Sequence, residues 1–320
     1  MVKKAISILL ILMTVLSVLS FNGCADEDDS KLTVICSVFP VYDWARNIVG
    51  DNEGVELRLL ISNGADPHSY QPTAEDVLEV RSADVMLRIG GESDGFINEL
   101  LKNAPKVLDL KLMEVEGITL CHTAKESHGH SHDDGHDHAT DEHIWLSLKN
   151  AATSVDAITK LLAKEAPEYA EEFHKNAEDY KKKLTELDEK YSGCVENAAE
   201  KKMIFADRFP FVYMTEDYHL EYAAAFEGCS TESEASFETV IQLADKLREW
   251  ELKVICITES STDDLAKRVI SSAGISDVSI VVFDSMQSVN ARRISDGETY
   301  IGIMEKNLIS LCTALGSAKT

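Results

Sequence analysis

The sequence has little positive charge, few cysteines and only one long apolar run. It carries 31 lysines and arginines against 56 acidic residues in 320 positions, a formal net charge of -25. This balance excludes a nucleic-acid-binding protein, because phosphates need a basic surface, whereas a negative surface concentrates cations. Seven scattered cysteines do not form a disulfide scaffold. A hydrophobic content of 44% excludes a wholly disordered chain.

Recognisable catalytic motifs are also missing. The sequence contains no H-E-x-x-H, no G-x-S-x-G and no P-loop. A secreted zinc hydrolase would need an open coordination position and a general base, and no motif supplies that combination. The sequence therefore predicts a protein that is not an enzyme.

The first residues are typical of an export signal. Two lysines precede an apolar run over residues 5–21, which is followed by Gly23 and Cys24. A positive start and a short apolar segment describe a secretory signal, and the run is slightly short for a permanent membrane helix. The Gly-Cys ending resembles the lipid-attachment site of bacterial lipoproteins, with Cys24 as the lipidated residue. No later segment is long and apolar enough to span a bilayer.

Beyond residue 31, short β-rich runs alternate with helical patterns in two series. The expected strands are residues 32–39, 55–61, 84–89 and 107–110, then 203–205, 222–226, 254–258 and 279–283. The expected helices are 44–49, 74–81, 96–102, 151–162 and 167–191, then 211–217, 237–250, 264–273 and 298–315. Alternation of this kind predicts parallel sheets with helices on both faces.

The predicted fold class is α/β, with two lobes, each a parallel sheet flanked by helices. One long rigid helix joins the lobes, and its many charges are expected to form a solvated face. The expected divisions are a signal peptide (1–23), a tether (24–31), an N-terminal lobe (32–165), a linking helix (166–200) and a C-terminal lobe (201–320). A ligand is expected in the cleft between the lobes, outside the carboxyl ends of the strands.

Histidines are concentrated in one segment. Six of the ten lie within residues 122–138, interleaved with carboxylates and glycines: His122, His128, His130, His132, His136 and His138. Neutral imidazole binds zinc, copper and nickel, and no spacing here forms a closed structural zinc finger. The segment is therefore predicted to be an auxiliary loop that binds several ions weakly. The alternative is a solvated low-complexity loop with no role.

Two further histidines lie in short motifs. His68 is in G-A-D-P-H-S-Y-Q-P-T (64–73), a loop restricted by its prolines, and His143 is in D-E-H-I-W-L-S-L-K-N (141–150). Together the motifs resemble the G-x-D-P-H-x-Y-x-P-T and D-x-H-I-W-L-x-x-x-N segments of the zinc- and manganese-specific solute-binding proteins of ABC transporters. The resemblance covers essentially the whole mature chain, including the lipoprotein start, the His-rich loop and the linking helix.

The resemblance implies a metal site formed by His68, His143 and Asp284. The family usually places a histidine or glutamate just after the first strand of the second lobe, where this chain has Ala206. Asp207 is the first substitute, provided that the strand ends after Phe205 and the chain turns. Its alternative role is that of an ion-pair partner of Arg208. The weaker substitutes are Glu234, Glu259 and a water; Glu259 has the alternative role of a helix-opening acid.

The family implies a receptor that captures a divalent ion outside the cell and delivers it to the transmembrane subunit of an ABC permease. Such a receptor would be a monomer, held by its lipid at the outer face of the cytoplasmic membrane. Two imidazoles with carboxylates are borderline between Zn²⁺ and Mn²⁺, and the His-rich loop favours Zn²⁺. The alternatives are a secreted zinc buffer and a zinc-dependent hydrolase.

The cysteines other than Cys24 give less information about the fold and the function. Cys36, Cys256 and Cys312 lie in apolar runs and are expected to be small core residues. An exported protein can pair some of its cysteines, and the sequence does not define which ones.

Overall fold

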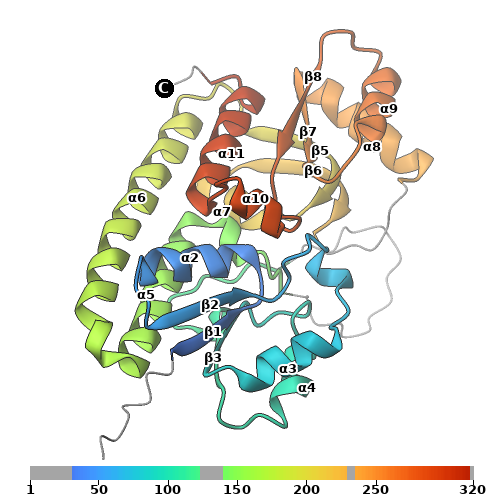
Figure 1. The fold of residues 1–320 in the computed structure, drawn as a ribbon. Coiled ribbons are helices and arrows are strands. Elements are labelled where there is room, and N and C mark those ends of the chain that lie inside the picture. The colour runs from blue at the N-terminus through green and yellow to red at the C-terminus, as the bar shows by residue number, and fades with distance from the viewer. Residues whose placement is uncertain (1–30, 123–139, 229–234, 318–320) are drawn as a thin grey trace, which may run out of the picture.

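The computed structural model describes residues 31–122, 140–228 and 235–317. It contains two four-stranded parallel sheets, with the strand orders β2-β1-β3-β4 and β6-β5-β7-β8 (Figure 1). The strands are β1 (Leu32–Cys36), β2 (Val55–Leu59), β3 (Val85–Arg88), β4 (Leu108–Lys111), β5 (Lys202–Phe209), β6 (Glu221–Glu227), β7 (Val254–Thr258) and β8 (Ser279–Phe283). Each sheet has its first strand between its second and third strands, so the two lobes repeat one topology. The predicted two-lobe α/β fold is confirmed.

Helices cover both faces of each sheet. The N-terminal lobe has α2 (Phe39–Val49), α3 (Ala74–Ser82), α4 (Phe96–Leu101) and α5 (Leu148–Glu165). The C-terminal lobe has α7 (Val212–Tyr218), α8 (Phe237–Glu249), α9 (Asp264–Ala273), α10 (Ala291–Ser295) and α11 (Tyr300–Ala314). The first helix begins five residues before its predicted start, because Pro40 lies in its first turn, where a missing N–H costs nothing. No helix among the described residues is long and apolar enough to cross a membrane.

One hydrophobic core extends through both lobes, and each sheet has a second core on its outer face. In β5, Met203 and Phe205 point into the shared core, whereas Ile204 and Ala206 point into the outer core beneath α8 and α9. This alternation follows from strand geometry, and the central strands of both sheets are largely buried on both faces, as in most parallel sheets. The side chain of Ala206 therefore packs in the outer core.

The linking helix α6 (Ala170–Glu196) runs along one side of the molecule, past both lobes (Figure 1). Its 27 residues span about 40 Å at 1.5 Å per residue. One apolar face is buried against the shared core, and most of the charged residues on the opposite face are exposed, as predicted. Asn176 donates to the carbonyl of Ile48 in the N-terminal lobe (3.1 Å), and the hydroxyl of Tyr191 donates to that of Met304 in the C-terminal lobe (2.7 Å).

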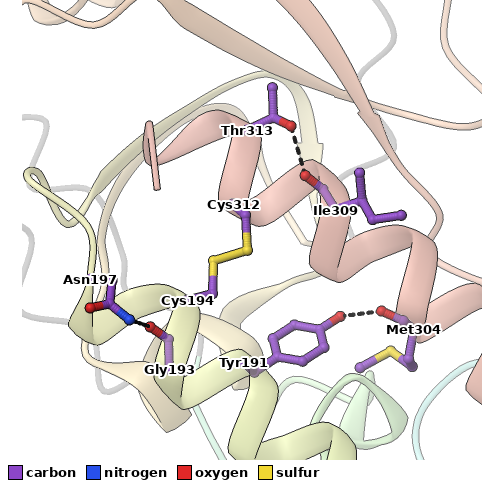
Figure 2. The surroundings of a disulfide bond; sticks show 8 residues. All are labelled: Tyr191, Gly193, Cys194, Asn197, Met304, Ile309, Cys312 and Thr313. Atoms are coloured by element: carbon purple, nitrogen blue, oxygen red, sulfur yellow. Dashed lines mark hydrogen bonds between the residues drawn. A yellow bond between two sulfur atoms is a disulfide. The ribbon is translucent and has the colours of Figure 1, made fainter. Parts of the chain in front are cut away.

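A disulfide joins the end of α6 to α11. Cys194 and Cys312 lie 5.7 Å apart at their Cα atoms and are bonded (Figure 2). Cys312 is buried in the shared core, as expected, and helix packing also brings it against the linking helix, where it is paired. Cys36 and Cys256 are buried, as expected, and they are not in a disulfide.

The strand β5 does not end after Phe205, and that prediction was wrong. It continues to Phe209 with a register shift against β6 between Phe205 and Arg208. At this irregularity the carboxylate of Asp207 accepts a hydrogen bond from the backbone N–H of Thr258 in β7 (2.8 Å). A side chain thus replaces a missing bond of the ladder, and the strand can continue without a turn.

Candidate metal centre

His68 lies on a short 3₁₀ turn, Pro67–Ser69, in the loop that follows β2. Asp66 caps this turn, because its Oδ1 accepts a hydrogen bond from the backbone N–H of His68 (3.0 Å). The other oxygen of Asp66 accepts from Arg208 of the C-terminal lobe (3.2 Å). The position of His68 is therefore set by a residue that also contacts the opposite lobe. Arg208 pairs with Asp66 and not with the Asp207 side chain, so the alternative ion-pair role predicted for Asp207 was wrong.

His143 is fully buried at the start of the segment that leads into α5. The Oδ1 atom of Asp141 accepts hydrogen bonds from both the backbone N–H and the Nδ1 of His143, each at 2.8 Å. The backbone carbonyl of Asp141 in turn accepts from the hydroxyl of Tyr213 on α7 (2.5 Å). His143 is thus held in one orientation by groups from both lobes.

The two imidazoles meet through their Nε2 atoms, which are 3.2 Å apart. Each Nδ1 points instead at a carboxylate: His68 at Glu142 Oε1 (2.9 Å) and His143 at Asp141 Oδ1 (2.8 Å). A carboxylate on Nδ1 favours the proton there, so that Nε2 is the nitrogen that can bind a metal ion. Two ligands of a tetrahedral zinc ion with Zn–N bonds of 2.0–2.1 Å lie about 3.4 Å apart, close to this spacing. We call His68 and His143 the histidine pair.

Glu142 is buried beneath the histidine pair. Its Oε2 accepts hydrogen bonds from the backbone N–H (3.0 Å) and hydroxyl (2.7 Å) of Ser93. Burial raises the pKa of Glu142, but the hydrogen bonds from His68 and Ser93 outweigh burial and lower that pKa to about 2. The carboxylate is ionised at neutral pH and favours a cation nearby. Gly91 permits this packing, because a Cβ there would lie 2.0 Å from Glu142 Oε2.

The C-terminal lobe reaches the histidine pair through Gln287. Its side-chain nitrogen lies 3.1 Å from Nε2 of His68 and also contacts Nε2 of His143. Sequence reasoning missed this residue. The sequence points to Gln287 only through its position three residues after Asp284, because the segment S-M-Q-S matches no metal-binding motif.

Asp284, the expected carboxylate ligand, follows β8 in the same loop. Its Oδ2 is paired with the guanidinium of Arg293, and its Oδ1 accepts from the backbone N–H of Met286 (2.8 Å). Arg293 also contacts Glu298. In this arrangement Asp284 shapes the loop that carries Gln287, and it would have to exchange Arg293 for an ion to become a ligand.

Asp207 lies between the carboxyl ends of β5 and β7. Its Oδ2 accepts from the backbone N–H of Thr258 (2.8 Å) and from that residue's hydroxyl, and its Oδ1 accepts from the backbone N–H of Arg208 (2.8 Å). To reach the histidine pair, the carboxylate would have to give up these three bonds.

Glu259 stabilises the loop that follows β8. It accepts hydrogen bonds from the backbone N–H (2.8 Å) and hydroxyl (2.9 Å) of Ser285 and from the hydroxyl of Ser288 (3.0 Å). Burial, and then the charge of Asp284, raise the pKa of Glu259. It does not open a helix, since α9 begins only at Asp264. Glu234, the other weaker candidate, lies outside the described residues.

Residues 31–122, 140–228 and 235–317 contain no group of three or more histidine, cysteine or acidic side chains placed to hold a metal ion. The structure therefore brings together two of the predicted ligands, His68 and His143. Of the predicted auxiliary loop, only His122 is described. It forms a β-bridge with Thr140, three residues before His143, so the segment begins and ends close to the site. His128, His130, His132, His136 and His138 lie outside the described residues.

Comparison with known proteins identifies the family of the chain. The ZnuA family model, described as the periplasmic component A of the zinc-uptake complex, matches residues 34–314. The chain belongs to this family. The resemblance stated from the sequence motifs is thereby confirmed.

Two relatives illustrate how far this similarity extends. The chain is 30% identical over 305 residues to the zinc-binding lipoprotein AdcA of Streptococcus pneumoniae, a match that covers 94% of this chain and 60% of AdcA. It is 28% identical over 298 residues to the high-affinity zinc uptake system protein ZnuA of Bacillus subtilis, covering 92% and 91% of the two chains. The chain thus spans about three fifths of AdcA and nearly all of ZnuA.

Solved structures of family members have the same fold. The Zn(II)-bound ZnuA-like domain of Streptococcus pneumoniae AdcA matches with a TM-score of 0.72 at 27% identity, covering 89% of this chain and 99% of the domain. The metal-dependent lipoprotein YcdH of Bacillus subtilis matches with a TM-score of 0.73 at 26% identity, covering 89% of this chain and all of YcdH.

Proposed function

We propose that the protein is the extracytoplasmic solute-binding receptor of an ABC importer, and that its cargo is a zinc ion. The observation that carries this proposal is the histidine pair, with its Nε2 atoms 3.2 Å apart and each Nδ1 on a carboxylate. Such pairs of carboxylate and histidine are typical of zinc ligands. Membership of the zinc-uptake family supports the same cargo.

His68 and His143 would form the N-terminal half of the site, with Asp284 as the carboxylate ligand and Asp207 as a further candidate. Because the histidines and the aspartates come from different lobes, a bound ion would link the lobes across the cleft. A permease could then release the ion by separating them. Two imidazoles favour zinc over manganese, which prefers oxygen ligands.

The receptor would work at the cell membrane. A lipid on Cys24 would hold it at the outer face of the cytoplasmic membrane, beside the transmembrane subunit of its permease, and it would act as a monomer. The His-rich segment would act as an auxiliary site that collects ions near the cleft. Many weak sites raise the local ion concentration and would speed capture when zinc is scarce.

The deciding experiment is metal analysis of the purified mature protein, followed by calorimetry with zinc and manganese in competition. We expect about one tightly bound zinc ion and several weakly bound ions per chain, with zinc displacing manganese. A protein that bound only several weak ions would be a buffer and not a receptor.

A deletion of residues 122–138 separates the auxiliary loop from the primary site. We expect the shortened protein to keep its tight zinc ion and to lose the weak ones, because His68 and His143, which we assign to the tight site, both lie outside the deleted segment. Loss of the tight ion would place the loop inside the primary site.

A further inference from the structure

The loop that presents Gln287 is fixed from both lobes. The indole N–H of Trp145, two residues after His143, donates to the carbonyl of Ser285 (2.9 Å). The N–H of Ser285 donates to Glu259 (2.8 Å), and the N–H of Met286 donates to Asp284 (2.8 Å). A side chain at position 287 therefore starts from a constrained backbone next to the histidine pair.

The backbone of this loop is also strained in front of Gln287. Met286 has a φ of 64°, in the left-handed region that a side chain with a Cβ rarely adopts. Such a conformation is unfavourable for a residue with a Cβ and persists where the surroundings hold it, often at binding sites. Met286 is buried, which holds it in place. The strained residue turns the chain just before the amide.

The amide of Gln287 completes a triangle with the two Nε2 atoms. It lies 3.1 Å from His68 Nε2, close to the 3.2 Å between the histidines, and it also contacts His143 Nε2. Both Nε2 atoms carry lone pairs, so without an ion the amide NH₂ can donate one hydrogen to each. Half a turn about the last side-chain bond exchanges NH₂ for the carbonyl oxygen, which is a metal ligand.

We propose that the side-chain carbonyl oxygen of Gln287 is a ligand of the bound zinc ion, supplied by the C-terminal lobe where Ala206 offers no donor atom. This inference rests on the proposed function. Ala206 points into the outer core, and the Asp207 carboxylate is bonded to Thr258 and Arg208. A neutral amide oxygen is a weaker zinc ligand than imidazole, so this site discriminates less strongly against manganese than a site with a third histidine.

The test is a zinc and manganese titration of the full chain with Gln287→Ala, Gln287→Glu and Gln287→His. Gln242→Ala is the control, since Gln242 is an exposed glutamine on α8. We expect Gln287→Ala to weaken zinc binding at least tenfold and Gln287→Glu to strengthen it. Gln287→His should raise the preference for zinc over manganese and change the visible spectrum of bound Co²⁺. The control should match the unsubstituted protein.

Two results would overturn the proposal. Unchanged zinc affinity in Gln287→Ala would remove the residue from the site, and tighter binding would show that the amide merely occupies the place of the ion. Should Gln287→Ala fail to fold, Gln287→Glu decides, because an added charge on a ligand must change the affinity. Absence of a tight zinc site in the unsubstituted protein would instead refute the receptor itself, so the two failures are distinguishable.

Discussion

The two lobes share one strand order but place different chemical groups at the candidate metal site. The N-terminal lobe presents two imidazoles, each held by its own buried carboxylate. The C-terminal lobe contributes an amide and several carboxylates whose oxygens already accept hydrogen bonds within the lobe. Repeated topology therefore does not imply repeated chemistry. For an ion to bind as we propose, the second lobe would have to adjust at Gln287 or Asp284.

The lobes also differ in how they hold the linking helix. The N-terminal lobe packs against α6, and the C-terminal lobe adds a covalent bond through Cys194 and Cys312. This difference predicts the largest effect on stability. Replacing both cysteines with alanine should lower the free energy of unfolding by about 4 kcal/mol, because the bond closes a loop across a sequence separation of 118 residues.

Urea unfolding of the metal-free protein measures this loss, and Cys121→Ala, at a half-buried unpaired cysteine, is the control. Hydrogen exchange should rise more in α11 than in α2. If the double variant and the control lost equal free energy of unfolding, the disulfide would not hold the C-terminal lobe to α6 more firmly than packing holds the N-terminal lobe.

Substitution of either member of the histidine pair should cause the largest loss of zinc affinity. Structural zinc sites bind with about 10–16 kcal/mol over four ligands, so one ligand contributes about 3 kcal/mol, or roughly a hundredfold in affinity. Calorimetry of His68→Ala and His143→Ala tests this, with the exposed His174→Ala on α6 as control. An undiminished tight site in either variant would exclude that histidine.

Asp141 in the N-terminal lobe and Glu259 in the C-terminal lobe each support a part of the candidate site, and their substitution should affect zinc binding to different degrees. Asp141→Asn removes the charge behind His143 and should weaken zinc binding about tenfold, the lower end of the effect of such partners. Glu259→Gln should change it much less, because the hydroxyls of Ser285 and Ser288 can rotate to accept from the new NH₂. A larger effect for Glu259→Gln in zinc titration would show that the C-terminal lobe is the more sensitive half.

The contact between Asp66 and Arg208 should have the smallest effect. Both side chains are partly exposed, and such ion pairs contribute about 0–1 kcal/mol. Arg208→Ala should therefore weaken zinc binding about threefold or less, and the difference should vanish in high salt, where the charges are screened. Arg292→Ala, at a largely exposed arginine on α10, is the control. A tenfold, salt-independent loss would mean that Arg208 positions His68 more directly.

Much of the fold was predictable, because hydrophobic alternation reports which faces of a strand or helix are buried. β7, β8 and α9 have the predicted boundaries, and α6 lies close to its predicted range. The errors have local causes. The side chain of Asp207 bridges a register shift and prolongs β5, and Pro40 starts α2 early. Neither effect appears in the periodicity of the sequence.

The candidate site was predictable only on its N-terminal side. His68 and His143 lie in short motifs whose spacing carries the information, and the structure brings them together. Asp207 and Asp284 also have the right chemistry, but the residues that hold them, Thr258 and Arg293, lie 51 and 9 positions further along the chain. Whether a carboxylate is available to an ion depends on such neighbours.

The sequence by itself determined the lobes, the linking helix, the family and the two histidines, because these follow from local periodicity and from short motifs. Only the tertiary structure decided three contacts. Cys194 is bonded to Cys312, Asp207 accepts a hydrogen bond from Thr258, and Gln287 contacts the histidine pair. Each of these contacts joins residues that are distant in the chain. Such contacts arise from the packing of whole helices and sheets, and a pattern of residue types along one segment carries no record of them.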